Sequence, residues 1–258
     1  MQHELPKYPP MQTRNNLDAI VLLALCFFLA APASVLAGVF SVTPVRIYMT
    51  PKDRAVAVTI TNEGNTEVVL QADLNAWSQK PDGTDEQVPT EDLILSPPII
   101  KLAPGARQVV RLALLKPADA SRQLIYRMIM REVPEATAAR DKTIEVPIAL
   151  ALSLPVFITP PPAKREMDCT AARSTPQALN VSCGNQGSAY AQVREISLMR
   201  GEQTIARFEG GTYILPGARK TMSLGINVSG QQSIAPGPAQ LSVRFDDGKS
   251  QVFSITLP

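Results

Sequence analysis

Histidine is almost missing from this sequence, since His3 is the one histidine among its 258 residues. Residues 1–37 have the pattern of an export signal that is cleaved off, so we expect the mature chain to contain no imidazole. Without imidazole, Ser/His and Cys/His nucleophile systems and His-containing metal sites are excluded. Most hydrolase chemistry is excluded with them.

The expected export signal, residues 1–37, has the three usual parts. A polar stretch contains Lys7 and Arg14, an apolar run covers residues 19–36, and Val-Leu-Ala at residues 35–37 forms a small-residue cleavage site. A retained membrane anchor is the alternative. The helix-breaking Pro32 and the small residues around it favour cleavage.

Cysteine is scarce as well, with three residues in the chain: Cys26, Cys169 and Cys183. Cys26 lies in the expected signal and follows Leu25, whereas lipoprotein processing requires a small residue there, so we expect no lipid anchor. An even pair of cysteines in an exported chain forms a disulfide more often than a metal site or a reactive thiol. We therefore expect a Cys169–Cys183 disulfide that closes a short loop in a second domain.

Neither sign of charge dominates, and aromatic residues are few. The chain has 25 Lys+Arg against 23 Asp+Glu, and the expected signal carries two of each kind, so the net charge is +2 before and after cleavage. This balance is not that of a bulk nucleic-acid or membrane-surface binder. Aromatic residues make up 5% of the chain, so we expect aliphatic cores around single anchors such as Trp77 and Phe245.

From residue 39 onward no stretch of helical periodicity is long enough to compete with the short alternating segments separated by turn residues, which predict an all-β protein. Residues 38–160 are expected to form an immunoglobulin-like sandwich, and residues 163–258 a second one, because the three prolines at 160–162 interrupt any strand ladder. In the first domain we expect strands at residues 40–49, 55–61, 67–77, 93–100, 107–115, 124–132 and 144–158. In the second we expect them at residues 177–182, 191–200, 203–208, 220–227, 239–245 and 251–257.

A weak internal repeat connects the two expected domains. Pro-Gly-Ala-Arg at residues 104–107 recurs at residues 216–219, and the Asn-x-Gly of residues 62–64 recurs at residues 185–187. Each domain thus has an Asn-x-Gly turn before a Pro-Gly turn. The repeat favours two related sandwiches, although turn residues are few enough to recur by chance.

Residues 144–154 form the most informative segment. Large aliphatic residues occupy every even position: Ile144, Val146, Ile148, Leu150, Leu152 and Leu154. Eleven residues of strand span about 35 Å, roughly twice a typical strand. Pro147 and Pro155 both stand at odd positions, so only one ladder of the strand loses donors. The pattern indicates an edge strand, which either serves its own core or is added to a partner's sheet.

Other candidate sites are weaker. The acidic residues between 82 and 92 are expected to form a solvated surface loop rather than a calcium site, and residues 209–211 a turn rather than a phosphate cradle. Arg46 lies within the apolar segment that we expect as the first strand. It is either a solvated outward residue or one that binds a carboxylate through paired hydrogen bonds.

Several short segments together resemble the PapD-like periplasmic pilus (fimbrial) assembly chaperones of the chaperone–usher pathway, and within them the archaic branch. The resemblance covers essentially the whole mature chain. It rests on Val-Thr-Pro-Val-Arg (42–46), Thr-Asn-Glu-Gly-Asn (61–65), Ser-Pro-Pro-Ile (96–99), Leu-Ala-Pro-Gly (102–105), Val-Val-Arg (109–111), Arg-Glu-Val-Pro (131–134) and the run 148–157.

The resemblance implies two immunoglobulin-like domains in a boomerang arrangement and a chaperone without enzymatic activity, cofactor or metal. Such a chaperone lends a strand to an unfinished pilus subunit in the periplasm and delivers it to an outer-membrane usher. The six aliphatics from Ile144 to Leu154 would be the donor residues. Arg46 matches the family arginine that anchors the subunit's terminal carboxylate.

The chain departs from the family at the second cation of that anchor, because Pro155 stands where a lysine is usual. Either Arg46 acts alone or a strand arginine such as Arg127 or Arg131 compensates. Two other classes of function stay open at this stage. One is a secreted structural or adhesive module that self-assembles by strand addition, and the other is an enzyme that uses paired carboxylates. An uncovered apolar strand also predicts some self-association.

Overall fold

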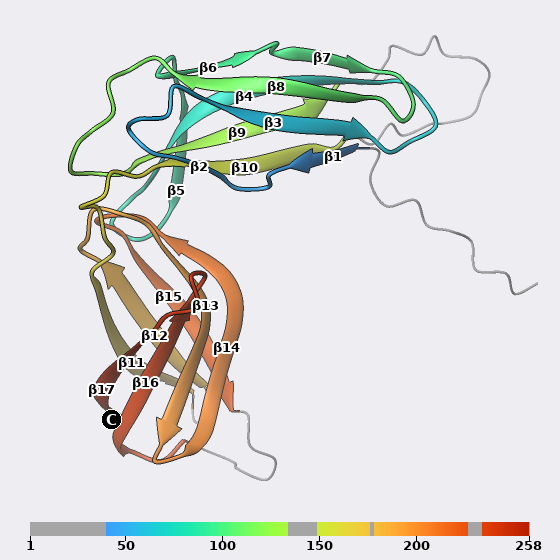
Figure 1. Cartoon of the computed structure of the whole chain (residues 1–258). Helices are drawn as coiled ribbons and strands as arrows, with labels where there is room; N and C mark the ends of the chain where they lie inside the picture. Colours follow the sequence, from blue (N-terminus) through green and yellow to red (C-terminus); the bar gives the residue numbers. More distant parts are fainter. Residues whose placement is uncertain (1–39, 134–148, 176–177, 227–233, 258) are drawn as a thin grey trace, which may run out of the picture. The chain divides into compact units, whose positions relative to one another are not determined.

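The computed structural model describes residues 40–133, 149–175, 178–226 and 234–257. Within them the chain forms strands and no helix, which confirms the all-β expectation. No helix in this described part is long and apolar enough to cross a membrane. Residues 38–258 form one compact unit that contains two β-sandwiches, the first built from β1–β10 and the second from β11–β17 (Figure 1).

Two sheets face each other in the first sandwich. A four-stranded sheet has the order β1-β3-β8-β6, and the opposing sheet has the order β2-β10-β9-β4-β5 with β7 paired to β4. Even residues of β10 and alternate residues of β3, β8 and β9 fill the space between them, which is the aliphatic core expected from the composition. The strands are β1 (Phe40–Thr43), β2 (Ile47–Met49), β3 (Ala55–Asn62), β4 (Val68–Gln79), β5 (Asp85–Pro89), β6 (Leu93–Ser96), β7 (Ile99–Leu102), β8 (Arg107–Leu114), β9 (Leu124–Glu132) and β10 (Ala151–Ile158).

Two expected single strands are each divided, so the prediction was wrong there. The segment 40–49 forms β1, which pairs antiparallel with β3, and β2, which pairs parallel with β10 in the other sheet. The segment 93–100 likewise gives β6, on β8, and β7, on β4. Pro44 and Pro97 lie at the two breaks, and since proline has no N–H for a ladder, each marks the point where the chain leaves one sheet for the other.

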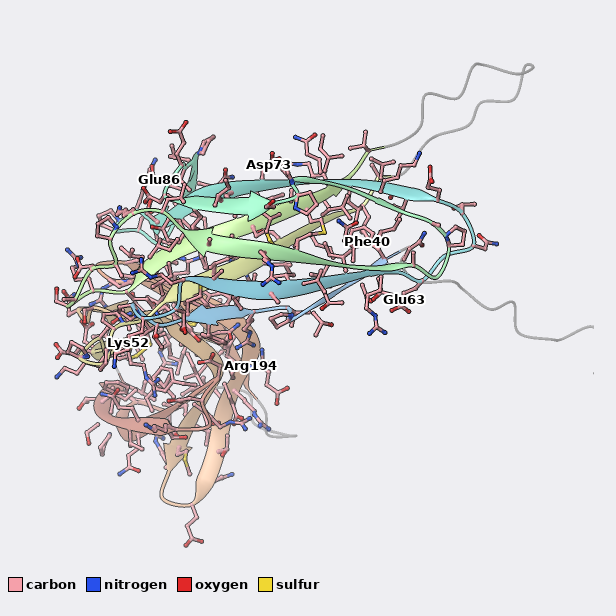
Figure 2. The ribbon with its side chains drawn as sticks, turned by 45° about the horizontal axis from the view of Figure 1, so that its top comes forward. Phe40, Lys52, Glu63, Asp73, Glu86 and Arg194 are labelled. Carbon is pink, nitrogen blue, oxygen red and sulfur yellow. A yellow bond between two sulfur atoms is a disulfide. The ribbon has the colours of Figure 1, made fainter. Side chains whose placement is uncertain are left out.

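The acidic segment between residues 82 and 92 was predicted as a solvated loop, which was wrong for its middle part. Asp85 and Glu86 belong to β5, which pairs antiparallel with the end of β4 through a register that includes Trp77 opposite Gln87. Every residue of β5 is exposed, as the labelled Glu86 illustrates in Figure 2. Among the described residues no cluster of acidic, cysteine or histidine side chains is placed to hold a metal ion.

The second sandwich is one folded sheet with the order β11-β12-β15-β14-β13-β16-β17. Its strands are β11 (Met167–Thr175), β12 (Ala178–Asn185), β13 (Ala191–Arg200), β14 (Gln203–Ile214), β15 (Arg219–Ile226), β16 (Gly237–Phe245) and β17 (Ser250–Leu257). The sequence pattern missed β11 and the second half of β14, so the turn expected at residues 209–211 was wrong, since these residues lie within β14. Both missed segments carry few apolar residues, so their alternation is faint.

The internal repeat corresponds to a repeated structure. Asn62 and Asn185 are both fully buried, and each side-chain amide donates to carbonyl oxygens of its own sandwich, at 2.8–3.1 Å for Asn62 and 2.8–3.0 Å for Asn185. The backbone N–H of Asn62 donates to Ala106 at 2.9 Å, and that of Asn185 donates to Ala218 at 3.0 Å. The two turns therefore close equivalent strand pairs, β3 with β8 and β12 with β15.

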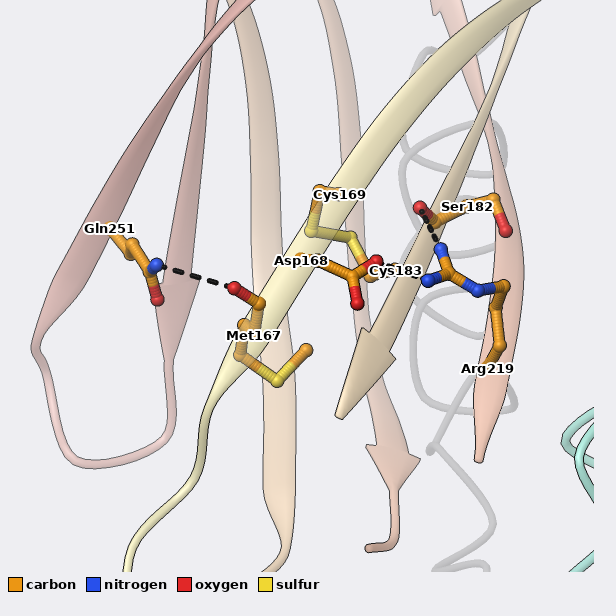
Figure 3. The surroundings of a disulfide bond; sticks show 7 residues. All are labelled: Met167, Asp168, Cys169, Ser182, Cys183, Arg219 and Gln251. Atoms are coloured by element: carbon orange, nitrogen blue, oxygen red, sulfur yellow. Dashed lines mark hydrogen bonds and ion pairs between the residues drawn. A yellow bond between two sulfur atoms is a disulfide. The ribbon is translucent and has the colours of Figure 1, made fainter. Parts of the chain in front are cut away.

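The expected disulfide is confirmed. Cys169 on β11 and Cys183 on β12 stand directly opposite each other, and both are buried. Figure 3 shows the neighbouring contacts, in which Arg219 forms an ion pair with Asp168 and donates to the carbonyl of Ser182 at 3.2 Å. The disulfide thus ties the edge strand β11 to the rest of the second sandwich.

Candidate binding site

One side of β10 is open over part of its length. β9 pairs with the whole of β10, whereas β2 pairs only with Val156–Ile158. In the described part of the chain no strand pairs with residues 151–155 on the side away from β9, and we call this side the open edge. A partner strand can therefore be added there without displacing any described strand.

The hydrogen-bond parity of β10 decides which groups face the open edge. The N–H of Glu132 on β9 donates to the carbonyl of Leu150 at 2.9 Å, so even residues point their backbone groups toward β9. The N–H of Thr159 donates to Met49 at 2.9 Å, so odd residues point the other way. Pro155 is an odd residue, and its missing N–H therefore falls at the open edge and leaves the ladder with β9 intact, as the sequence predicted.

The even side chains of β10 face the sandwich core to different degrees. Leu154 is 6% exposed and belongs to the core of the first sandwich, whereas Leu150 and Leu152 are only half-buried against it. Ile144, Val146 and Ile148 lie outside the described residues. Within the described part of this segment, the apolar surface that a guest strand could still bury therefore lies at Leu150 and Leu152. Leu154 is already buried in the core of the first sandwich.

Arg46 lies in the bend between β1 and β2 and not within a strand, which corrects the sequence prediction. Its Nη1 donates to Oδ2 of Asp246 at 2.9 Å, and Asp246 follows β16 in the second sandwich. The Arg46 side chain is 32% exposed and that of Asp246 is 11% exposed. Of the two alternatives for Arg46, a solvated residue or a carboxylate binder, the structure has an arginine that is paired with a carboxylate of the chain itself and still has access to solvent.

Two tyrosines complete this polar group. The Tyr190 hydroxyl donates to the same Asp246 Oδ2 at 2.9 Å, and it lies 2.9 Å from the hydroxyl of Tyr48. Burial, followed by the hydrogen bond with Tyr48, raises the pKa of Tyr190 far above its ordinary value, so this phenol stays protonated and remains a donor. These side chains line a pocket of about 660 Å³ together with basic residues, namely Lys164, Arg165 and Lys249.

Aromatic rings pack against the polar group of Arg46, Asp246 and the two tyrosines. Phe157, the odd residue that follows Val156 on β10, is fully buried and stacks on Tyr190 with ring centroids 4.0 Å apart and on Tyr48 at 5.7 Å. Trp77 and Tyr213 lie at 6.4 and 6.1 Å from the same ring. No motif in the sequence marks these tyrosines as site residues. Their scarcity was the available signal, since three of the five tyrosines in the chain gather here.

The structure separates the two candidate compensating arginines. Arg127 on β9 lies directly opposite Pro155, its guanidinium stands 3.6 Å from the centroid of the Trp77 ring, and its Nη1 lies 3.4 Å from the carbonyl of Ser153. Burial lowers the pKa of Arg127. Arg131 forms an ion pair with Asp73 on the outer side of the sheet. Of these two arginines, only Arg127 thus contacts the aromatic cluster around Phe157.

The comparisons with known proteins fit this description. Residues 39–164 match the family model of the pili and flagellar-assembly chaperones, PapD N-terminal domain. The match covers the entire first sandwich, including β10. Through this domain the chain is similar to the PapD-type pilus-assembly chaperones. Members of that family are folding chaperones and not enzymes, so the carboxylate-enzyme alternative is set aside.

Solved structures share the fold over both sandwiches. The chain matches a chain of the CsuC–CsuE chaperone–tip adhesion subunit complex of Acinetobacter baumannii with a TM-score of 0.59 and 18% identity, covering 86% of this chain and 100% of that one. The Escherichia coli chaperone DraB matches with a TM-score of 0.54 and 15% identity, covering 85% and 96%. A chain of the Salmonella enterica SafA pilin–SafB chaperone complex gives 0.54 and 16%, covering 87% and 99%.

At these identities the likeness concerns the fold, and it confirms two β-sandwich domains of the pilus-chaperone type. A search of the curated proteins found no match. The assignment of individual residues to a site therefore depends on the geometry of this chain.

Proposed function

We propose that this chain is a periplasmic chaperone that binds and folds pilus subunits by donor-strand complementation and delivers them to an outer-membrane usher. The observation that carries the proposal is the open edge of β10 in a domain that matches the PapD-type family. Chaperone–pilin pairs are an established example of strand addition to a sheet edge. Cleavage of residues 1–37 during export would place the mature chain where subunits fold.

The donor segment of this proposal consists of residues 144–154. Backbone groups of residues 151 and 153 are directed toward the open edge and would pair with a guest strand, and the alternating aliphatics would fill the guest's groove. Each apolar side chain that a guest buries contributes about 1.5–3 kcal/mol before ordering costs are subtracted. Leu150 and Leu152 offer such surface, and Ile144, Val146 and Ile148 extend it on the sequence pattern.

The carboxylate anchor of this proposal is Arg46, assisted by Arg127. Arg127 has the position that makes this role reasonable, because it faces Pro155, the residue at which the family lysine is missing. Both cations also act on the same phenol, since Arg46 and Arg127 each lower the pKa of Tyr213 against the larger opposing effect of burial, which leaves that pKa raised. Tyr213 thus lies within electrostatic range of the two guanidinium groups.

The archaic branch of the family is part of the proposal, with the sequence motifs and the CsuC–CsuE match as its support. Self-assembly by strand addition is the competing function, because an open edge also accepts a second copy of the same chain. The two functions predict different partners for the same edge.

The test is co-expression of the mature chain with candidate secreted subunits, recovery of the complex and hydrogen exchange on residues 144–155. Capture of a subunit with new protection concentrated there supports the proposal, and Arg46→Ala should weaken that capture. Ordered homo-oligomers with the same protection and no captured subunit would favour self-assembly. Capture with protection confined to the second sandwich would contradict strand donation.

A further inference from the structure

The anchor site already holds a carboxylate that belongs to the chain itself. Asp246 Oδ2 accepts hydrogen bonds from Arg46 Nη1 and from the Tyr190 hydroxyl, both at 2.9 Å. One charged donor and one neutral donor therefore converge on a single carboxylate oxygen. Charge-assisted bonds of this kind are among the stronger hydrogen bonds of a protein.

Asp246 is held firmly in this position. Its backbone N–H donates to the carbonyl of Gln192 at 3.1 Å, and the turn that follows is closed by hydrogen bonds between Phe245 and Lys249 and between Gly248 and Phe245. The side chain is 11% exposed. The backbone that carries this largely buried carboxylate is therefore fixed beside the guanidinium, so the carboxylate is a local competitor at high effective concentration.

The next residue, Asp247, is also an acid but pairs with a different cation, so the two carboxylates can be distinguished by mutation. Asp247 pairs with Arg165 through both of its oxygens, at 3.0 and 3.2 Å. Arg165 in turn lies over the ring of Phe245, 4.1 Å from the centroid. Asp247 therefore neutralises a different cation of the same pocket, and within the described part of the chain it forms no ion pair with Arg46.

We propose that Asp246 is a built-in competitor of the guest carboxylate, so that this residue sets how tightly Arg46 takes a chain-terminal carboxylate. The inference depends on the proposed anchor role of Arg46. A guest carboxylate must displace or share the Asp246 contact, and two carboxylates on one guanidinium repel each other. The guest carboxylate thus binds Arg46 more weakly than it would in the absence of Asp246. Weaker binding suits a chaperone that must later release its subunit.

The test uses two small probes, N-acetyldiglycine, which ends in a free carboxylate, and the corresponding C-terminal amide. Each is titrated into the mature chain, with the Arg46 side-chain NMR signal as readout. In Asp246→Asn the amide keeps the shape of the side chain and can still accept from Tyr190, but the competing charge is gone. Asp247→Asn is the matched control, since it removes the same charge one residue further along the chain.

Asp246→Asn is expected to bind the free acid about fivefold more tightly than the wild type, the equivalent of a partly exposed ion pair. The amide probe should gain nothing, and Asp247→Asn should match the wild type. Suppose that Asp246→Asn binds the acid equally or more weakly, while Arg46→Ala abolishes the wild-type binding. This result would overturn the inference but not the proposed function, and it would make Asp246 a positioning residue. If no variant binds the acid in an Arg46-dependent manner, the anchor in the proposed function fails as well.

Discussion

Pro155 on β10 lies directly opposite Arg127 on β9. The proline removes a donor at the open edge, and the arginine brings a cation to the same level of the sheet from the neighbouring strand. A cation missing from one strand is thus available from the strand beside it. This relationship connects the two halves of the proposed site, the donor edge and the carboxylate anchor.

Leu152→Asp should reduce subunit capture at least tenfold, because a charged side chain in the donor segment cannot enter an apolar groove without a large desolvation cost. The measurement is the amount of co-expressed subunit recovered per chaperone. Val252→Asp is the matched control, since Val252 is 57% exposed on β17 of the second sandwich. Leu152→Ala separates lost function from lost fold, and normal capture by a folded Leu152→Asp protein would contradict strand donation.

Arg127→Ala should weaken capture of a subunit with a native C-terminus by about tenfold, the equivalent of one hydrogen bond to a charged group. Arg131→Ala should leave capture unchanged, because Arg131 is engaged with Asp73 away from the aromatic group. Arg127→Lys keeps the charge but loses the planar stack over Trp77. Affinities measured by calorimetry for the three variants check the assignment, and equal losses for Arg127→Ala and Arg131→Ala would refute it.

Replacing Cys169 and Cys183 together by Ala should lower the free energy of unfolding of the second sandwich by about 3 kcal/mol, the value expected for a closed loop of this size. Subunit capture at low temperature should persist, because the disulfide lies in β11 and β12 and not at the open edge. Chemical denaturation with and without reductant provides the measurement. Loss of capture in a folded variant would show a role for the disulfide beyond stability.

Asn62→Ala and Asn185→Ala should destabilise their own sandwiches by about 1–3 kcal/mol each, because either change leaves buried carbonyl groups without their donor. Denaturant titrations followed by hydrogen exchange would assign each loss to one sandwich. Asn180→Ala, at an exposed position of β12, is the control. Very different losses for the two buried asparagines would show that the repeated turns are equivalent in geometry but not in energy.

Glu195 should make stability depend on pH at the acid end. Burial opposes ionisation of its carboxyl, but hydrogen bonds from Arg207, Ser197 and Arg244 outweigh that effect and lower the pKa. Because the folded pKa lies below the ordinary 4.5, the stabilisation is complete above that value and is lost as the pH falls through the lowered one.

The pH dependence can be checked by measuring the free energy of unfolding between about pH 3 and pH 7. Glu195→Gln should flatten the acid side of the curve, whereas Glu202→Gln, at an exposed turn, should keep the wild-type shape. An unchanged acid limb in Glu195→Gln would mean that other carboxylates account for acid unfolding.

Much of the fold followed from local patterns. Period-two alternation and turn residues predicted the two β-domains and most strands, and the cysteine pair in an exported chain predicted its disulfide. The parity of Pro155 predicted which ladder would lose a donor, since alternation is a property of the strand itself. These features depend on neighbouring residues, so they can be read without knowing the tertiary structure.

Other features depended on pairing between distant segments. Competition between strands for the same sheet edge decides three of these features. Pro44 and Pro97 mark crossings between sheets, β2 covers only the end of β10, and Asp85 and Glu86 pair with β4. β11 and the end of β14 have little apolar alternation, so only their neighbours hold them as strands.

The sequence by itself determined the alternating apolar run of residues 144–154 and the presence of Arg46 in a matching segment, because both are local. Only the tertiary structure decided that Arg46 meets Asp246, 200 residues further along the chain, and that Tyr190 donates to the same carboxylate oxygen. No pattern in the sequence encodes such a meeting, since it follows from how two separately folded sheets bring their turns together.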